Sequence, residues 1–150
     1  MTNEHSLDER ARAILSQNDI GSYTVPTHGL YPYQWNWDSA FAAMGIAQYN
    51  LDRAWTELET LFSGQWDDGM VPHILFHRND EGYFPGPEVW KGRGPIPSSG
   101  ISQPPVAATM ARRIFAKNPE LGSSRLGPLY NCLVSWHRCV RCRCWYPVPR

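Results

Sequence analysis

The chain has 150 residues, and its 14 Lys and Arg balance its 14 Asp and Glu, so the formal net charge is zero. A protein that binds duplex nucleic acid usually carries a clustered basic excess, which the first 131 residues lack, so no nucleic-acid partner is expected. The longest strongly apolar run is far shorter than the ~20 residues that span a bilayer, and the N-terminus is too polar for a signal peptide. The sequence therefore predicts a soluble, cytoplasmic protein without a membrane partner.

The first predicted helix begins at Ser6-Leu7-Asp8-Glu9. This tetrapeptide fits the capping-box pattern, with Glu9 at the third helical position. Gly21 closes the segment, and apolar residues recur at helical spacing before it, at Leu7, Ala11, Ile14 and Leu15. This pattern predicts a short amphipathic helix. A loop rich in Pro, Gly and Tyr follows over residues 21–33.

The next predicted helix is almost entirely apolar. From Ser39 to Tyr49 the only strongly polar side chains are those of Ser39 and Gln48. A helix that is apolar on nearly all sides is expected to be buried on all sides.

A third helix, of amphipathic character, follows after a short turn. Asp52 is expected to cap it, and Arg53, Glu57 and Glu59 are expected to lie outside. Its apolar stripe consists of Ala54, Trp55, Leu58, Leu61 and Phe62. A buried helix followed by an amphipathic one indicates concentric layers, with an inner ring of helices wrapped by an outer ring.

Residues 65–100 show almost no helical periodicity. Val71–Phe76 is predicted to be extended, and residues 82–100 form a loop rich in Pro and Gly whose aromatic content argues against disorder. Pro104-Pro105 then suit the beginning of a helix, which Asn118-Pro119 ends. The apolar stripe of that helix consists of Val106, Met110, Ile114 and Phe115.

The C-terminal segment differs from the rest in composition. All four cysteines, Cys132, Cys139, Cys142 and Cys144, fall within the last 19 residues, together with several arginines. A zinc site is one interpretation, although only one C-x-x-C pair is present and no second pair stands at zinc-finger distance. The other is a truncated or frame-shifted end. We favour the second, so residues 131–150 are treated as an atypical tail and no metal is expected.

Polar side chains embedded in aromatic surroundings are the candidates for a functional site. Asp38 stands at the beginning of the apolar helix, where its carboxylate could accept from free backbone N–H groups or from ligand hydroxyls. Trp35 and Trp37 flank it and would supply apolar walls. A helix cap is the alternative role of Asp38, and an ordinary core is the alternative role of the aromatic residues.

Four motifs occur in order along the chain: YPYQWNWDS at 31–39, Gln65 with DGMVPH at 68–73, GYFPGP at 82–87 and SGISQPP at 99–105. This series resembles the mannosylglycerate and glucosylglycerate hydrolases of glycoside hydrolase family 63, over about Ser6 to Tyr130. The QWxWD and SGIxQPP elements are the most specific. The resemblance implies an all-α fold, an (α/α)6 toroid whose central funnel binds an α-glucoside or α-mannoside of glycerate without a cofactor.

The resemblance also implies roles for individual residues. Tyr31, Trp35, Trp37 and Asp38 would line the subsite for the sugar ring. Tyr83 and Gln103 would come from loops that close over the substrate, with His73 as support behind them.

The chain departs from the family because it lacks the residues that would act as general acid and general base. The family's inverting mechanism uses an Asp as general acid and a Glu as general base, about 6.5–9.5 Å apart across the sugar. By resemblance both lie after the region matched here, so no catalytic residue is assigned. Twelve helices of ~12 residues each with short loops need about 190 residues.

Residues 1–130 are therefore expected to form the N-terminal part of the catalytic domain: a partial toroid of the first few helices with long loops. As an inactive fragment of an inverting glycosidase, the chain would carry part of the pocket for glucosylglycerate or mannosylglycerate. A non-catalytic sugar- or partner-binding remnant is the first alternative. Another toroid enzyme, related to trehalases or glucoamylases, is the second.

Overall fold

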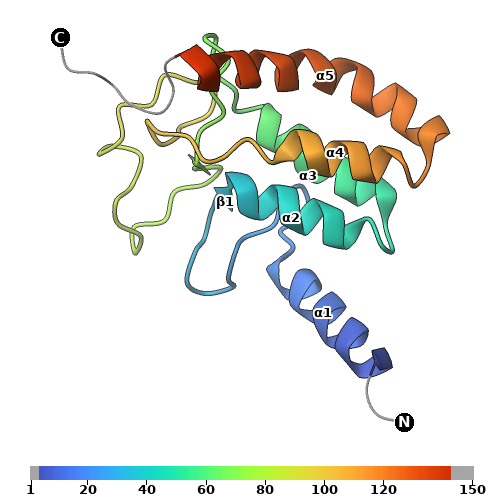
Figure 1. Ribbon diagram of the computed structural model, residues 1–150. Helices are drawn as coiled ribbons and strands as arrows, with labels where there is room; N and C mark the ends of the chain where they lie inside the picture. Colours follow the sequence, from blue (N-terminus) through green and yellow to red (C-terminus); the bar gives the residue numbers. More distant parts are fainter. Residues whose placement is uncertain (1–3, 143–150) are drawn as a thin grey trace.

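The computed structural model describes residues 4–142 as five helices and one small antiparallel sheet (Figure 1). The helices are α1 (Glu4–Asn18), α2 (Asn36–Ile46), α3 (Leu51–Phe62), α4 (Ala107–Phe115) and α5 (Pro119–Cys142), and the strands are β1 (Gln34–Trp35) and β2 (Ile74–Leu75). The predicted all-α class is confirmed. Within residues 4–142, no helix combines the length and the apolarity needed to cross a membrane.

Helices α2 to α5 pack into one body, from which α1 projects (Figure 1). Helix α2 contacts α1, α3 and α4, while α5 contacts α3 and α4. The largest core cluster unites buried side chains of all four packed helices, among them Ile46, Leu58, Ile114 and Trp136. Helix α4 thus lies against both members of the α2–α3 pair.

Two helices expose apolar surface that the sequence pattern assigned to the interior. Helix α1 begins at Glu4, so Ser6 lies inside it and the predicted capping box is wrong. Leu7 and Ile14 on its apolar stripe are 60% and 58% exposed. Phe41 on α2 is 53% exposed, so α2 is not buried on all sides. The physical reason is the same in both cases, since no part of residues 4–142 covers these faces.

Helix α3 differs from its prediction in its cap and in one buried charge. Asn50, rather than Asp52, is the cap, because its Oδ1 accepts from the backbone N–H of Arg53 at 3.0 Å. Glu57, expected outside, is fully buried. The apolar residues of the predicted stripe are all buried, as expected: Ala54, Trp55, Leu58, Leu61 and Phe62.

The long segment between α3 and α4 is irregular, and short β contacts tie it to the start of α2. Strand β1 pairs antiparallel with β2, so that Gln34 faces Leu75 and Trp35 faces Ile74. Isolated bridges join Leu75 to Ser98 and Pro72 to Ser102. These contacts bring the first, second and fourth sequence motifs side by side.

Helix α5 crosses the predicted boundary at 130/131 without interruption. Beyond that boundary Leu133 and Trp136 are buried in the core, and the Trp136 indole N–H donates to Ser102 Oγ at 3.1 Å. Gln65 Nε2 donates to the carbonyl of Cys132 at 2.9 Å. The chain is therefore integrated into the core as far as Trp136, whereas residues 143–150, with Cys144, lie outside the described residues.

Candidate functional site

The QWxWD motif forms one side of a cavity of about 190 Å³ at the N-terminal end of α2. Its lining consists of Pro26, Tyr31, Trp35, Trp37, Asp38 and Gln103. Five of the six predicted sugar-binding residues therefore share one hollow, four from residues 31–38 and Gln103 from the loop before α4. Pro26 was not among the predicted site residues, since its side chain carries no polar group.

A hydrogen bond to the backbone of α2 holds the Gln103 side chain at this cavity. Its Oε1 accepts from the backbone N–H of Trp37 at 3.0 Å. That N–H belongs to the first turn of α2, where the chain offers no intrahelical acceptor. The carbonyl of the amide is thus used in capping α2 from a distant loop, which fixes the position of the amide nitrogen at the cavity.

Asp38 is not the N-cap of α2. The cap position is Trp35, without a side-chain hydrogen bond, and Asp38 follows in the first helical turn. Burial raises the pKa of the Asp38 carboxyl, while hydrogen bonds with its own backbone and with the Trp37 side chain oppose that shift. A half-buried carboxylate in a cavity is suited to accept hydroxyl hydrogens, since charge-assisted hydrogen bonds strengthen away from bulk water.

A row of rings extends from the cavity into the protein. Tyr31 packs edge-on against Trp35 at 5.5 Å, Trp35 against His73 at 5.2 Å, and His73 against Trp90 at 5.2 Å. His73 is 8% exposed, and burial lowers its pKa to about 4. Its imidazole is therefore neutral at pH 7, and it supports the Trp35 ring as a packing partner.

Two polar atoms in this row lack hydrogen-bond partners among residues 4–142. They are the indole nitrogen of Trp35 and Nδ1 of His73, both buried. Unsatisfied buried polar atoms are rare in folded proteins and call for an explanation such as a bound polar molecule. Trp35 lines the cavity and His73 does not, so of the two only the Trp35 indole N–H is a candidate donor to a polar ligand there.

The buried carboxylate of Glu57 holds the two ends of the QWxWD segment. Its Oε1 accepts from Gln34 Nε2 at 3.3 Å and from Ser39 Oγ, which flank the motif residues Trp35 and Asp38. Thr24 Oγ1 donates to the same oxygen at 3.0 Å. Burial raises the pKa of the Glu57 carboxyl, whereas the hydrogen bond from Ser39 and the Arg53 charge oppose that shift.

Arg53 completes this buried network. Its Nη2 lies 2.9 Å from Glu57 Oε2 and 2.7 Å from Asp19 Oδ1, so it links α3 to the end of α1. The helical spacing of α3 indicated that Glu57 is buried. Residue 57 lies three positions after Ala54 and four before Leu61, on the same face as the core stripe. Its charge alone led to the prediction that it lies outside.

Tyr83 lies in a neighbouring cavity of about 370 Å³. Tyr31 lines both cavities, while Arg78 and Asp80 give the second one its charged groups. The Tyr83 ring packs edge-on against buried Tyr33 at 5.1 Å, and burial raises the pKa of its phenol. The structure therefore does not bring Tyr83 into the cavity of Asp38 and Gln103, and its predicted role in closing over a substrate stays a prediction.

Comparison with known proteins gives one family match and several similar proteins. Residues 31–141 match the mannosylglycerate hydrolase MGH1-like glycoside hydrolase domain. The chain is 52% identical over 133 residues to mannosylglycerate hydrolase MGH2 of Selaginella moellendorffii, covering 87% of this chain and 27% of that protein. It is 40% identical over 147 residues to the glucosylglycerate hydrolase of Mycolicibacterium hassiacum, covering 88% of this chain and 33% of that protein.

A solved structure agrees with these matches. The crystal structure of the glycoside hydrolase family 63 mannosylglycerate hydrolase from Thermus thermophilus, in complex with Tris and D-glycerate, superposes with a TM-score of 0.81 at 50% identity. The match covers 88% of this chain and 32% of that one. The resemblance predicted from the four motifs is thus confirmed, and the chain spans about a third of the length of these relatives.

Proposed function

Because the chain belongs to the family of mannosylglycerate hydrolase MGH1-like glycoside hydrolase domains, we propose that it supplies one wall of the sugar pocket of an inverting glycoside hydrolase. The proposed substrate is glucosylglycerate or mannosylglycerate. The proposed general acid and general base lie outside this chain. Its own part is to bind and orient the glycosyl unit.

One observation carries this proposal: a single carboxylate and an amide share a cavity with three aromatic rings. Asp38 would accept from adjacent sugar hydroxyls, and the Gln103 amide nitrogen would donate to a sugar oxygen. Tyr31, Trp35 and Trp37 would pack against the C–H faces of the ring. Groups of this kind, held in place before the substrate arrives, favour a productive orientation of the scissile bond.

The test is a chimera in which residues 31–141 replace the matching segment of the Thermus thermophilus mannosylglycerate hydrolase. In this chimera Asp38→Ala should lower kcat/KM for the glycosylglycerate by about 10- to 150-fold, because each lost charge-assisted hydrogen bond is worth about 1.5–3 kcal/mol. Steady-state release of glucose or mannose measures the effect.

Asp52→Ala is the matched control, since Asp52 lies in the first turn of α3 but outside the cavity. It should leave kcat/KM within about twofold of the parent chimera. If Asp38→Ala instead lowers the melting temperature while turnover stays normal, Asp38 has a structural role only and the proposed sugar contact is wrong.

The alternative of a non-catalytic binding remnant makes a different prediction. The 150-residue chain alone should then bind the glycosylglycerate, and a chimera built with it should not hydrolyse the substrate. Isothermal titration of the chain alone, together with the activity of the chimera, separates the two. Faster cleavage of trehalose than of glucosylglycerate by the chimera would instead favour the trehalase-like alternative.

A further inference from the structure

The two most specific motifs each contain one position that the motif leaves open. In QWxWD this position is Asn36, and in SGIxQPP it is Ser102. Neither side chain lines the cavity of the sugar site. Both nevertheless donate to one atom, the carbonyl oxygen of buried Val71, at 3.2 Å from Asn36 Nδ2 and 2.6 Å from Ser102 Oγ. A single carbonyl of the second motif therefore joins the first motif to the fourth.

This junction closes a ring of contacts between the two sides of the sugar site. Asn36 immediately precedes Trp37, and Ser102 immediately precedes Gln103. The far ends of the two pairs are also joined, since the Trp37 backbone N–H donates to Gln103 Oε1 at 3.0 Å. Gln103 is thus held at two points, through its side chain by α2 and through Ser102 by Val71. A side chain locked by contacts on both sides keeps one orientation, so the ring directs the amide nitrogen of Gln103.

Helix α5 determines where the Ser102 hydroxyl points. The Trp136 indole N–H donates to Ser102 Oγ at 3.1 Å. Because an indole nitrogen can only donate, Ser102 Oγ accepts from it and keeps its own hydrogen for the Val71 carbonyl.

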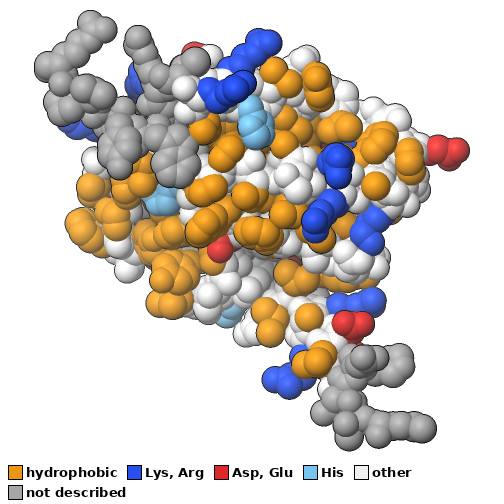
Figure 2. All heavy atoms as spheres, viewed as in Figure 1, with side chains coloured by type: hydrophobic (Ala, Val, Ile, Leu, Met, Phe, Trp, Pro, Cys, Tyr) orange, Lys and Arg blue, Asp and Glu red, His pale blue; other side chains and the backbone are white. Residues whose placement is uncertain are grey.

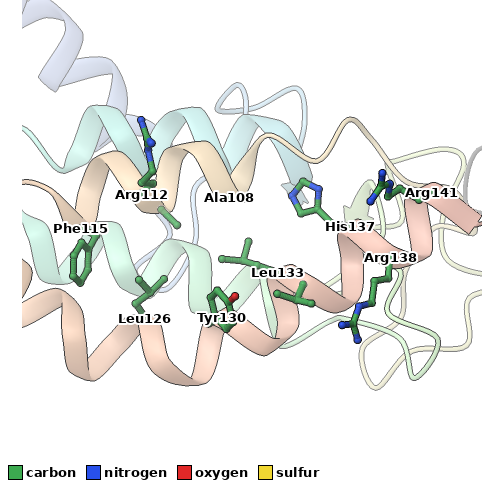
Figure 3. Close-up of a pocket in the computed structure, with 11 residues that line it drawn as sticks. Ala108, Arg112, Phe115, Leu126, Tyr130, Leu133, His137, Arg138 and Arg141 are labelled. Atoms are coloured by element: carbon green, nitrogen blue, oxygen red, sulfur yellow. The ribbon is translucent and has the colours of Figure 1, made fainter.

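The hydrogen bond distinguishes Trp136 from the other apolar residues of α5. Trp136 is fully buried, whereas Tyr130, on another side of α5, lines a hollow beside α4 (Figure 3). Hydrophobic side chains also cover much of the outer face of the molecule (Figure 2). Apolar character alone therefore does not account for the place of Trp136, whose indole N–H gives the fourth motif a fixed polar contact.

We propose that Ser102 is a positioning residue for the sugar site. Its hydroxyl connects Trp136 of α5 to the second motif, and it thereby holds the Gln103 amide at the cavity that Asp38 shares. Asn36 anchors the beginning of α2 to the same carbonyl. This role rests on the proposed sugar site, whereas the ring of hydrogen bonds can be tested without a sugar.

The first test follows hydrogen exchange of the Trp37 backbone N–H by NMR in the full 150-residue chain. Ser102→Ala should speed this exchange about tenfold or more, because it loosens the Gln103 side chain that accepts from the N–H. Ser102→Thr keeps a hydroxyl and should restore slow exchange. The N–H of Arg53 is the internal control, since Asn50 Oδ1 accepts from it in the same way on α3. It should exchange at an unchanged rate in all variants.

Three outcomes of this test would overturn the proposal. Equal acceleration at Trp37 and Arg53 would show that Ser102 contributes only general stability. An unchanged Trp37 N–H in Ser102→Ala, or equally fast exchange in Ser102→Thr and Ser102→Ala, would show that the hydroxyl does not hold Gln103. If Ser102→Ala does not fold, Trp136→Phe removes the indole N–H but keeps an aromatic ring, and the same two N–H groups decide.

The second test measures turnover in the chimera that carries residues 31–141, which contains the whole ring. Ser102→Ala should lower kcat/KM for the glycosylglycerate about 3- to 10-fold, the effect of losing one neutral hydrogen bond. The loss should fall mainly on kcat, since the substrate still binds but is oriented less well. Ser63→Ala is the matched control, because the Ser63 hydroxyl also donates to a backbone carbonyl, that of Thr60, outside the cavity. It should leave kcat/KM unchanged.

The Asp38→Ala chimera separates failure of this role from failure of the sugar site. If Asp38→Ala lowers kcat/KM and Ser102→Ala does not, the positioning role is wrong and the proposed function stands. If neither variant lowers it, the sugar site itself is wrong, and the positioning role with it.

Discussion

Glu57→Ala is expected to lower the free energy of unfolding by about 3–5 kcal/mol, the range for removing one partner of a buried, hydrogen-bonded charge pair. The substitution leaves Thr24, Gln34 and Ser39 without the oxygen to which they donate, and leaves the half-buried Arg53 without its α3 partner. Alanine is a good helix former, so the loss does not come from helix propensity. Urea denaturation followed by circular dichroism measures the change.

Glu59→Ala is the control on the same helix. Glu59 is partly exposed and pairs with Arg125 at 2.6 Å, so its replacement should cost about 1 kcal/mol or less. If Glu57→Ala unfolds the chain outright, Glu57→Gln gives an intermediate variant whose stability can be measured. Equal losses for Glu57→Ala and Glu59→Ala would show that the buried network contributes no more than a surface ion pair.

His73 is expected to make the protein less stable in mild acid. Its pKa is lowered by burial from 6.5 to about 4, so the folded state favours the neutral ring. This contribution is complete above pH 6.5 and is lost as the pH falls from 6.5 towards 4, because the unfolded chain takes up the proton first. With about 1.36 kcal/mol per pKa unit, the loss amounts to about 3 kcal/mol.

The measurement is the free energy of unfolding at several pH values between 4 and 7, for the parent and for His73→Gln. Burial also lowers the pKa of His77, which acts in the same direction, whereas the raised pKa values of Asp38 and Glu57 act in the opposite one. The difference between the two proteins therefore isolates His73. Parallel curves for parent and His73→Gln would contradict the prediction.

Sequence periodicity predicted α1 to α4 because burial of an apolar stripe leaves a local pattern, but it did not predict α5 (Pro119–Cys142). The stripe of α4 shows this, with Met110 and Ile114 buried as expected. Periodicity could not predict which faces remain uncovered, since that depends on segments outside these residues. Leu7 and Phe41 are exposed for this reason, although each stands in an apolar pattern.

The residues of the candidate site were predicted more completely than the hydrogen bonds that hold them in place. Four of its residues came from the first motif and Gln103 from the fourth, and the structure places all five around one cavity. The contacts that hold them, from Glu57 to Gln34 and from Gln103 to the Trp37 backbone, are long-range hydrogen bonds. Such contacts leave no periodic trace, so only the three-dimensional arrangement reveals them.

The two-residue pairing of Gln34 and Trp35 with β2 has a consequence for how related chains can vary in length. Neighbouring residues of a strand point to opposite faces, here an amide towards Glu57 and an indole towards the cavity. A single residue inserted between Tyr33 and Gln34 that shifted the pairing would exchange these faces and direct the indole towards a carboxylate. Length variation is therefore compatible with the exposed loop around residue 80 but not with this short strand.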